Sequence, residues 1–125
     1  MVRKVCLDTD VLISLFKKDE ATKNLIENLR DCSFSITSIN VFDLWLGRKK
    51  QEQTSELIES LEVFDFDKNS AKIAADILRA LKKKGELLEF RDVFIAAVCI
   101  NNNLELLTYN KKHFNRLKSF GLILL

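Results

Sequence analysis

Three aspartates stand at the edges of apolar segments of the sequence, where an uncompensated charge is costly. They are Asp8, Asp43 and Asp92, and each has a run of apolar residues directly beside it. If folding brings these carboxylates together, they repel one another unless a cation lies between them. Carboxylate oxygens are ligands of Mg²⁺ in proteins, and substrate phosphates often complete its coordination. The three aspartates therefore predict a divalent-metal site for chemistry on phosphate esters, in which the metal activates a water molecule.

Neutral oxygen donors occur close to the same positions. The expected ends of strands carry the hydroxyl and amide side chains of Thr9, Ser38, Thr108 and Asn110. Such groups support a site for a hard cation, which prefers oxygen ligands to thiolates. The sequence has no glycine-rich phosphate loop, so it does not indicate hydrolysis of a nucleoside triphosphate.

Each aspartate also has a structural explanation. Asp8 or Asp10 could cap the helix that follows the first strand, and Asp92 near a helix start is favoured by the helix dipole. Asp43 is harder to explain in this way, because a lone carboxylate among apolar residues is usually paired or ligating. The only histidine, His113, has no serine or cysteine nucleophile placed to form a triad, which favours a surface or helix-terminal role.

The elements that would position these residues alternate between short β-like segments and longer helical ones, which is typical of an α/β fold with a mostly parallel sheet. Strands are expected at 5–7, 34–37, 63–66, 104–108 and 122–125. Helices are expected at 10–17, 21–29, from 38 or 39 to 47, 70–84 and 91–100, with another through Leu57, Ile58 and Leu61. Ser38 is the expected N-cap of its helix and Gly47 its stop. Sites in such folds form beyond the carboxyl ends of the strands, which is compatible with one shared cleft for the aspartates.

The composition fits one globular domain over residues 1–125. Apolar residues make up 47% of the chain and charged residues 30%, a balance that permits a core of ordinary size. The net charge of +2 is too small to indicate nucleic-acid binding by itself, and the basic runs 48–50 and 82–84 suit helix ends. Cysteines without metal-finger spacing, no signal peptide and no membrane-spanning apolar run predict a cytoplasmic protein that does not cross a membrane.

Four segments, in order along the chain, resemble the motifs of PIN domains. They are Leu7–Ile13, Thr37–Gly47, Asp92–Ala97 and Leu107–Phe114. The compact size without an added domain is similar to VapC toxins of type II toxin–antitoxin modules. The resemblance implies a three-layer α/β/α fold and an endoribonuclease that depends on Mg²⁺ or Mn²⁺. It also implies an RNA substrate, homodimerisation and inhibition by a VapB-like antitoxin.

Carried over residue by residue, the resemblance makes Asp8, Asp43 and Asp92 the metal-binding acids. Thr108 becomes a polar neighbour, as does Thr9 beside Asp8, and Asn110 holds the position of a fourth acid. Two residues depart from the family's pattern. The second acid is usually a glutamate, which is one methylene longer than Asp43. Asn110 replaces an aspartate, which removes a negative charge and should weaken metal binding.

Basic residues expected near the cleft, namely Arg48, Lys49 and Arg91, would hold RNA phosphates. Two alternatives remain open at this point. Asp43 and Asn110 favour a PIN-like binding module whose catalytic site has decayed. The Asp8-Thr9-Asp10 segment is similar to the start of haloacid-dehalogenase-type phosphatases, although the further motifs of that family are not found.

Overall fold

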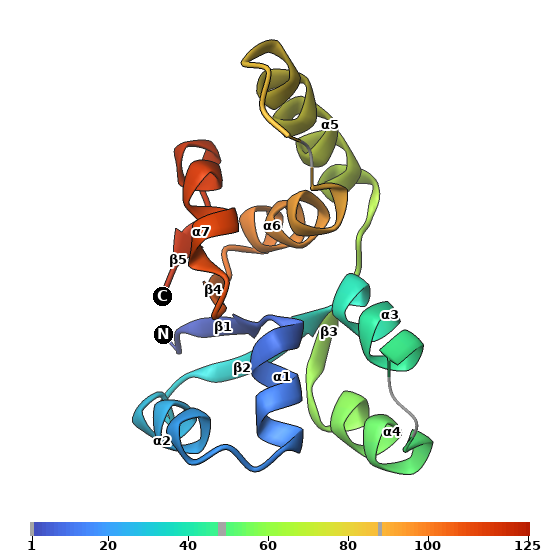
Figure 1. Ribbon diagram of the computed structural model, residues 1–125, viewed down its shortest axis with the longest axis vertical. Coiled ribbons are helices and arrows are strands. Elements are labelled where there is room, and N and C mark those ends of the chain that lie inside the picture. The colour runs from blue at the N-terminus through green and yellow to red at the C-terminus, as the bar shows by residue number, and fades with distance from the viewer. Residues whose placement is uncertain (1, 48–49, 88) are drawn as a thin grey trace.

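The computed structural model describes residues 2–47, 50–87 and 89–125, and its centre is a parallel sheet with strand order β3-β2-β1-β4-β5 (Figure 1). The strands are β1 (Lys4–Leu7), β2 (Ser33–Thr37), β3 (Glu62–Phe64), β4 (Glu105–Leu107) and β5 (Ile123–Leu124). The strand order reverses at β1, because β2 and β3 extend the sheet on one side and β4 and β5 on the other. Sites in open parallel sheets form beyond the strand ends at such a reversal.

Helices cover both faces of this sheet (Figure 1). One face carries α1 (Thr9–Phe16), α2 (Glu20–Asn28) and α4 (Gln51–Ser60). The other carries α5 (Lys68–Lys83), α6 (Phe90–Asn102), the short α7 (Lys111–Phe114) and the 3₁₀ segment η1 (Asn115–Phe120). Helix α3 (Ser38–Gly47) packs against both layers, because Ile39 and Leu44 belong to different clusters of core residues. The predicted three-layer α/β/α fold with a parallel sheet is confirmed.

Strand β1 shows how the core positions the site. Val5 and Leu7 pack into the cluster on the α1 side, whereas Cys6 packs into the cluster on the α6 side. This alternation is the period of two that a strand imposes, and it buries all three residues because both faces are covered. The strand is thereby fixed in register with β4, where Leu7 pairs with Leu107. The residues after these two strands, Asp8 and Thr108, are consequently held side by side.

Several element boundaries differ from the predicted ones. Helix α5 begins at Lys68 and not at 70, because the Asp67 side chain caps it by accepting from the Ser70 N–H at 2.9 Å. Strand β3 ends at Phe64, two residues early, and the Phe66 N–H donates to the Ser38 hydroxyl. The last residue of helix α6 is Asn102. The next residue, Asn103, has the left-handed conformation typical of a helix end.

The largest omission concerns the segment between the last two strands, for which the sequence predicted no helix. In the structure, α7 occupies this segment and η1 follows it directly. Phe114 of α7 and Leu117 of η1 are fully buried against the core. Among the described residues, no helix combines the length and hydrophobicity needed to cross a membrane.

Candidate active site

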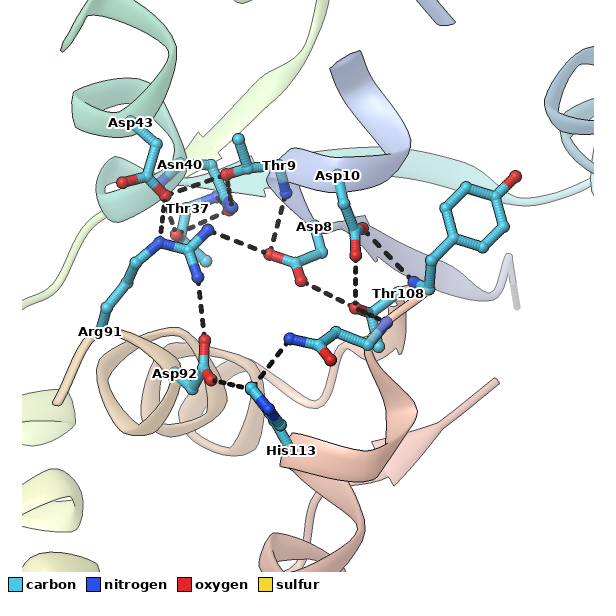
Figure 2. A network of polar contacts seen from close by, with 12 residues as sticks. Asp8, Thr9, Asp10, Thr37, Asn40, Asp43, Arg91, Asp92, Thr108 and His113 are labelled. Atoms are coloured by element: carbon cyan, nitrogen blue, oxygen red, sulfur yellow. Dashed lines mark hydrogen bonds and ion pairs between the residues drawn. The ribbon is translucent and has the colours of Figure 1, made fainter. Parts of the chain in front are cut away.

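The three predicted aspartates converge on the guanidinium group of Arg91 (Figure 2). Asp8 follows β1, Asp43 lies on α3, and Asp92 lies in the first turn of α6. The Arg91 Nε lies 2.6 Å from Asp43 Oδ2, Nη1 lies 2.8 Å from Asp92 Oδ1, and Nη2 lies 3.6 Å from Asp8 Oδ1. Residues that are 83 positions apart in sequence, such as Asp8 and Arg91, therefore belong to one charged cluster.

The carboxylate of Asp8 is held by two different elements. It caps α1, because Oδ1 accepts from the Thr9 N–H at 2.8 Å. Its Oδ2 accepts from the Thr108 hydroxyl at 2.7 Å, at the end of the neighbouring strand β4. Asp8 is thus the N-cap of α1, as one structural explanation proposed, and it also faces Arg91. One carboxylate both starts a helix and contributes charge to the cluster.

Asp43 is held by a buried polar chain that the sequence analysis missed. The Thr9 hydroxyl donates to Asp43 Oδ2 at 3.0 Å and accepts from Asn40 Nδ2 at 3.0 Å. Asn40 Oδ1 in turn accepts from the Thr37 N–H at 2.9 Å, and the Asn40 N–H donates to the Thr37 hydroxyl at 3.2 Å. The last two bonds form the reciprocal pair of a capping box, with asparagine in the place of Glu or Gln. The spacing Thr37-x-x-Asn40 was the signal available in the sequence.

Ser38 does not take the predicted position. Thr37, and not Ser38, makes the capping bonds at the start of α3, and Ser38 is the first residue of that helix. The Ser38 hydroxyl accepts from the Phe66 N–H at 2.9 Å, which ties α3 to the loop after β3. The prediction that Ser38 supports the carboxylates and caps the helix is therefore wrong. Adjacent hydroxyl residues at a helix start look alike in sequence, and only the path of the chain distinguishes them.

Asp10 joins the cluster from the side of β4. It does not cap α1, since it lies within the first turn. Its Oδ2 accepts weakly from the Thr108 hydroxyl at 3.4 Å and its Oδ1 from the Tyr109 N–H at 3.3 Å. Burial and the nearby charge of Asp8 raise the pKa of the Asp10 carboxyl above its ordinary value. Asp10 is a further acid of this site that was not among the predicted metal-binding acids.

Asp92 contacts the side chains of both Arg91 and His113. Besides Arg91, its Oδ2 lies 3.4 Å from Nδ1 of His113, which lies on α7 (Figure 2). Burial raises the pKa of the Asp92 carboxyl and outweighs the opposing effect of Arg91, and Asp8 raises this pKa further. His113 is half exposed and helix-terminal as predicted, but it also faces the site.

Asn110 and Thr108 both lie at this edge of the sheet, as predicted. The Asn110 N–H donates to the Thr108 hydroxyl at 3.0 Å, and the Asn110 side-chain nitrogen lies 2.9 Å from His113 Nδ1. Asn110 and Asp92 therefore both lie next to Nδ1 of His113. The predicted phosphate contacts Arg48 and Lys49 lie outside the described residues.

The side chains of the cluster fit a divalent metal by chemical type. Asp8, Asp43, Asp92 and the neighbouring Asp10 offer oxygen ligands, which hard cations such as Mg²⁺ prefer. Cys6 and Cys99 are buried in the core and do not compete as ligands. Over the described ranges, however, no three acidic, histidine or cysteine side chains stand in a ready metal-holding arrangement. The acids are arranged around a guanidinium.

Replacement of the buried amide in Asn40→Ala is expected to lower the free energy of unfolding by about 1–3 kcal/mol. The amide makes side-chain bonds to Thr37 and Thr9 in a fully buried position, so its loss removes a cap and leaves the Thr9 hydroxyl without its donor. Urea unfolding measures the change. Asn24→Ala, on the exposed side of α2, is the control and should change stability by less than about 0.5 kcal/mol. Equal stability of the two variants would contradict the structural role of Asn40.

Comparisons with known proteins identify relatives of this chain. The family model of the PIN domain matches residues 5–119. Ribonuclease VapC1 of Methanocaldococcus jannaschii is 38% identical over 120 residues, which cover 95% of this chain and 85% of that protein. Ribonuclease VapC3 of the same organism is 36% identical over 92 residues, which cover 74% of this chain and 94% of that protein. The crystal structure of VapBC2 from Rickettsia felis bound to a promoter DNA fragment matches with a TM-score of 0.82 and 27% identity, and the match covers 98% of this chain and 97% of that chain. The chain therefore belongs to the PIN domain family.

Proposed function

We propose that this protein is a metal-dependent endoribonuclease of the VapC type, the toxin of a toxin–antitoxin pair. The observation that carries the proposal is the convergence of three carboxylates at the reversal of the strand order. Asp8, Asp43 and Asp92 surround the guanidinium of Arg91 there. The names of the relatives, Ribonuclease VapC1 and VapC3, support ribonuclease activity. Membership in the PIN family argues against the haloacid-dehalogenase alternative.

Asp8, Asp92 and Asp43 would hold the metal, and Mg²⁺ or Mn²⁺ suits their oxygen ligands. A divalent ion supplies Lewis acidity at the scissile phosphate and neutralises charge in the transition state. The protein's own part is to orient the acids. Thr108 fixes one oxygen of Asp8 while the other faces the centre of the cluster. Thr9 fixes the shorter second acid, Asp43, by donating to the same oxygen that Arg91 contacts.

Basic side chains would hold RNA phosphates. We retain Arg91, Arg48 and Lys49 for this role. A pocket of about 230 Å³ next to His113 is also lined by the basic side chains of Lys112 and Arg116, together with the acidic Glu89. A chain of phosphates would be attracted by the basic side chains at low salt.

A VapB-like antitoxin is the proposed protein partner. The related Rickettsia felis structure is a VapBC2 complex. On this chain, exposed apolar side chains gather on α3, where Phe42, Trp45 and Leu46 are 62%, 44% and 75% exposed. An adjacent pocket of about 290 Å³ lies between Phe42 and Phe94 and reaches Arg91. The apolar face of an amphipathic antitoxin helix would cover these side chains and the adjacent pocket. We further propose one domain over residues 1–125, a homodimer and a cytoplasmic location.

Removal of divalent metal is expected to stop cleavage. The test substrate is a pool of single-stranded RNA of randomised sequence, incubated with the purified protein in Mg²⁺ and in EDTA. We expect fragments in Mg²⁺, a loss of at least about a hundredfold in rate in EDTA, and recovery when Mn²⁺ is added in excess. Undiminished cleavage in EDTA would contradict metal dependence.

The same assay tests the alternative of a decayed PIN-like binding module, which Asn110 and the absence of a ready metal arrangement within the described ranges favour. That alternative expects RNA binding without fragments under every metal condition. Fragments that depend on metal would exclude it.

A further inference from the structure

We propose that Arg91 is a built-in counterion that competes with the divalent metal for Asp8, Asp43 and Asp92, so that metal binds only when the guanidinium leaves. This inference rests on the proposed metal-dependent function. It gives Arg91 a role in the metal-free protein in addition to the proposed RNA contact. In the metal-free protein, Arg91 holds the three carboxylates together.

The geometry of Arg91 carries the proposal. Each of the three guanidinium nitrogens faces its own carboxylate. The nitrogen–oxygen distances are 2.6 Å to Asp43, 2.8 Å to Asp92 and 3.6 Å to Asp8. The planar fork of an arginine suits such multiple contacts, and each charge-assisted bond is stronger than a neutral one. The acids can share a centre because the guanidinium is already there (Figure 2).

The electrostatics make the arginine and the metal mutually exclusive. The Arg91 side chain is cationic, because an arginine guanidinium keeps its proton in proteins. A fixed positive charge beside a bound dication would repel it strongly over a few ångströms. Because Arg91 cannot relieve this repulsion by losing its proton, it must move away for the metal to enter.

Arg91 also has somewhere to go. Its side chain is 42% exposed, whereas those of Asp8, Asp92 and Asp43 are 4%, 8% and 14% exposed. The arginine thus lies over the mouth of the cluster and the acids lie beneath it. It lines the pocket between Phe42 and Phe94, where an arginine can pack against aromatic rings. A rotation outward would uncover the acids without a change in the backbone.

Calorimetric titration with Mn²⁺ tests the competition. The proteins are the wild type, Arg91→Gln, Arg91→Lys and the control Arg79→Gln, which removes an exposed arginine paired with Asp76 on α5. We expect Arg91→Gln to bind Mn²⁺ more tightly than the wild type by at least about tenfold, the scale on which one neighbouring charge changes ion affinity. Arg91→Lys should fall between them, because an ammonium group cannot contact three carboxylates as a fork. Arg79→Gln should match the wild type.

Thermal unfolding provides a second readout that needs no catalysis. In EDTA, Arg91→Gln should melt at a lower temperature than the wild type, because its three acids are left without a cation. Saturating Mn²⁺ should raise its melting temperature by more than that of the wild type. If Arg91→Gln does not fold in EDTA, the comparison of Arg91→Lys with the wild type still tests the proposal.

The outcomes separate this inference from the proposed function. Mn²⁺ affinity in Arg91→Gln or Arg91→Lys that is equal to or weaker than that of the wild type would overturn the competition and leave a metal-dependent enzyme standing. The absence of saturable Mn²⁺ binding in all four proteins would overturn both the metal-dependent function and the competition.

Discussion

Asp8→Asn is expected to reduce RNA cleavage by at least about a hundredfold while the protein stays folded. Loss of a partner that merely orients a metal ligand already costs about 10–100-fold, and Asp8 faces the centre of the cluster directly. The fold should survive because asparagine caps helices as well as aspartate does. Its side-chain oxygen can still accept from the Thr9 N–H. The Thr108 hydroxyl donates to Asp8 in the wild type, and the asparagine amide can bond to the same hydroxyl in the reverse direction, as the donor.

The measurement is the initial rate of cleavage of the randomised RNA pool in Mg²⁺, together with a melting curve for each protein. Asp67→Asn is the matched control, because Asp67 caps α5 in the same way but is not part of the cluster. That control should cleave at the wild-type rate. Equal rates for Asp8→Asn and the wild type would remove the assignment of this site as catalytic.

Phe114→Ala is expected to cause the largest loss of stability, about 3–5 kcal/mol. Phe114 is fully buried on α7 and packs into the core cluster on the α6 side of the sheet. Truncation leaves a cavity that its neighbours can fill only in part. Domains of this size have about 5–15 kcal/mol of stability in total, so the variant should lie near the threshold of unfolding. Its melting temperature should fall by on the order of 10–20 °C.

Urea and thermal unfolding check this expectation. Phe42→Ala makes the same truncation at a side chain that is 62% exposed, and it should change stability by less than about 0.5 kcal/mol. Phe114→Leu leaves a smaller cavity and should lose less than Phe114→Ala. If Phe114→Ala were as stable as Phe42→Ala, α7 would not be anchored through its phenylalanine. Because α7 also carries His113, the destabilised variant should lose cleavage along with stability.

Much of the fold followed from local patterns. The alternation of short β-like segments with amphipathic helices predicted a parallel α/β sheet, and five strands with helices on both faces confirmed it. Helix α3 ends at Gly47 as predicted, but Ser38, the predicted N-cap, is its first residue. The segment after β4 was missed because α7 has four residues, too few for a helical period to be visible. Burial of Phe114 by distant elements stabilises it.

The sequence by itself determined which residues carry charge next to the core. Asp8, Asp43 and Asp92 stood out because a carboxylate beside apolar residues needs a partner, and this cost is visible in the amino-acid order alone. Thr108 and Asn110 were also found, since they follow a strand that ends at the same edge of the sheet.

Only the tertiary structure decided what the carboxylates face. Arg91 was expected at the substrate, but the packing of α6 against α3 and β1 brings its guanidinium among the acids. Likewise Asn40, and not Ser38, supports Asp43 because Asn40 faces Thr9 on α1 whereas Ser38 faces the loop after β3. Side-chain charge is a property of a residue, whereas its partner depends on distances between segments that are far apart in sequence. The sequence thus determined the acids of the site, and the fold determined that an arginine of the same chain lies between them.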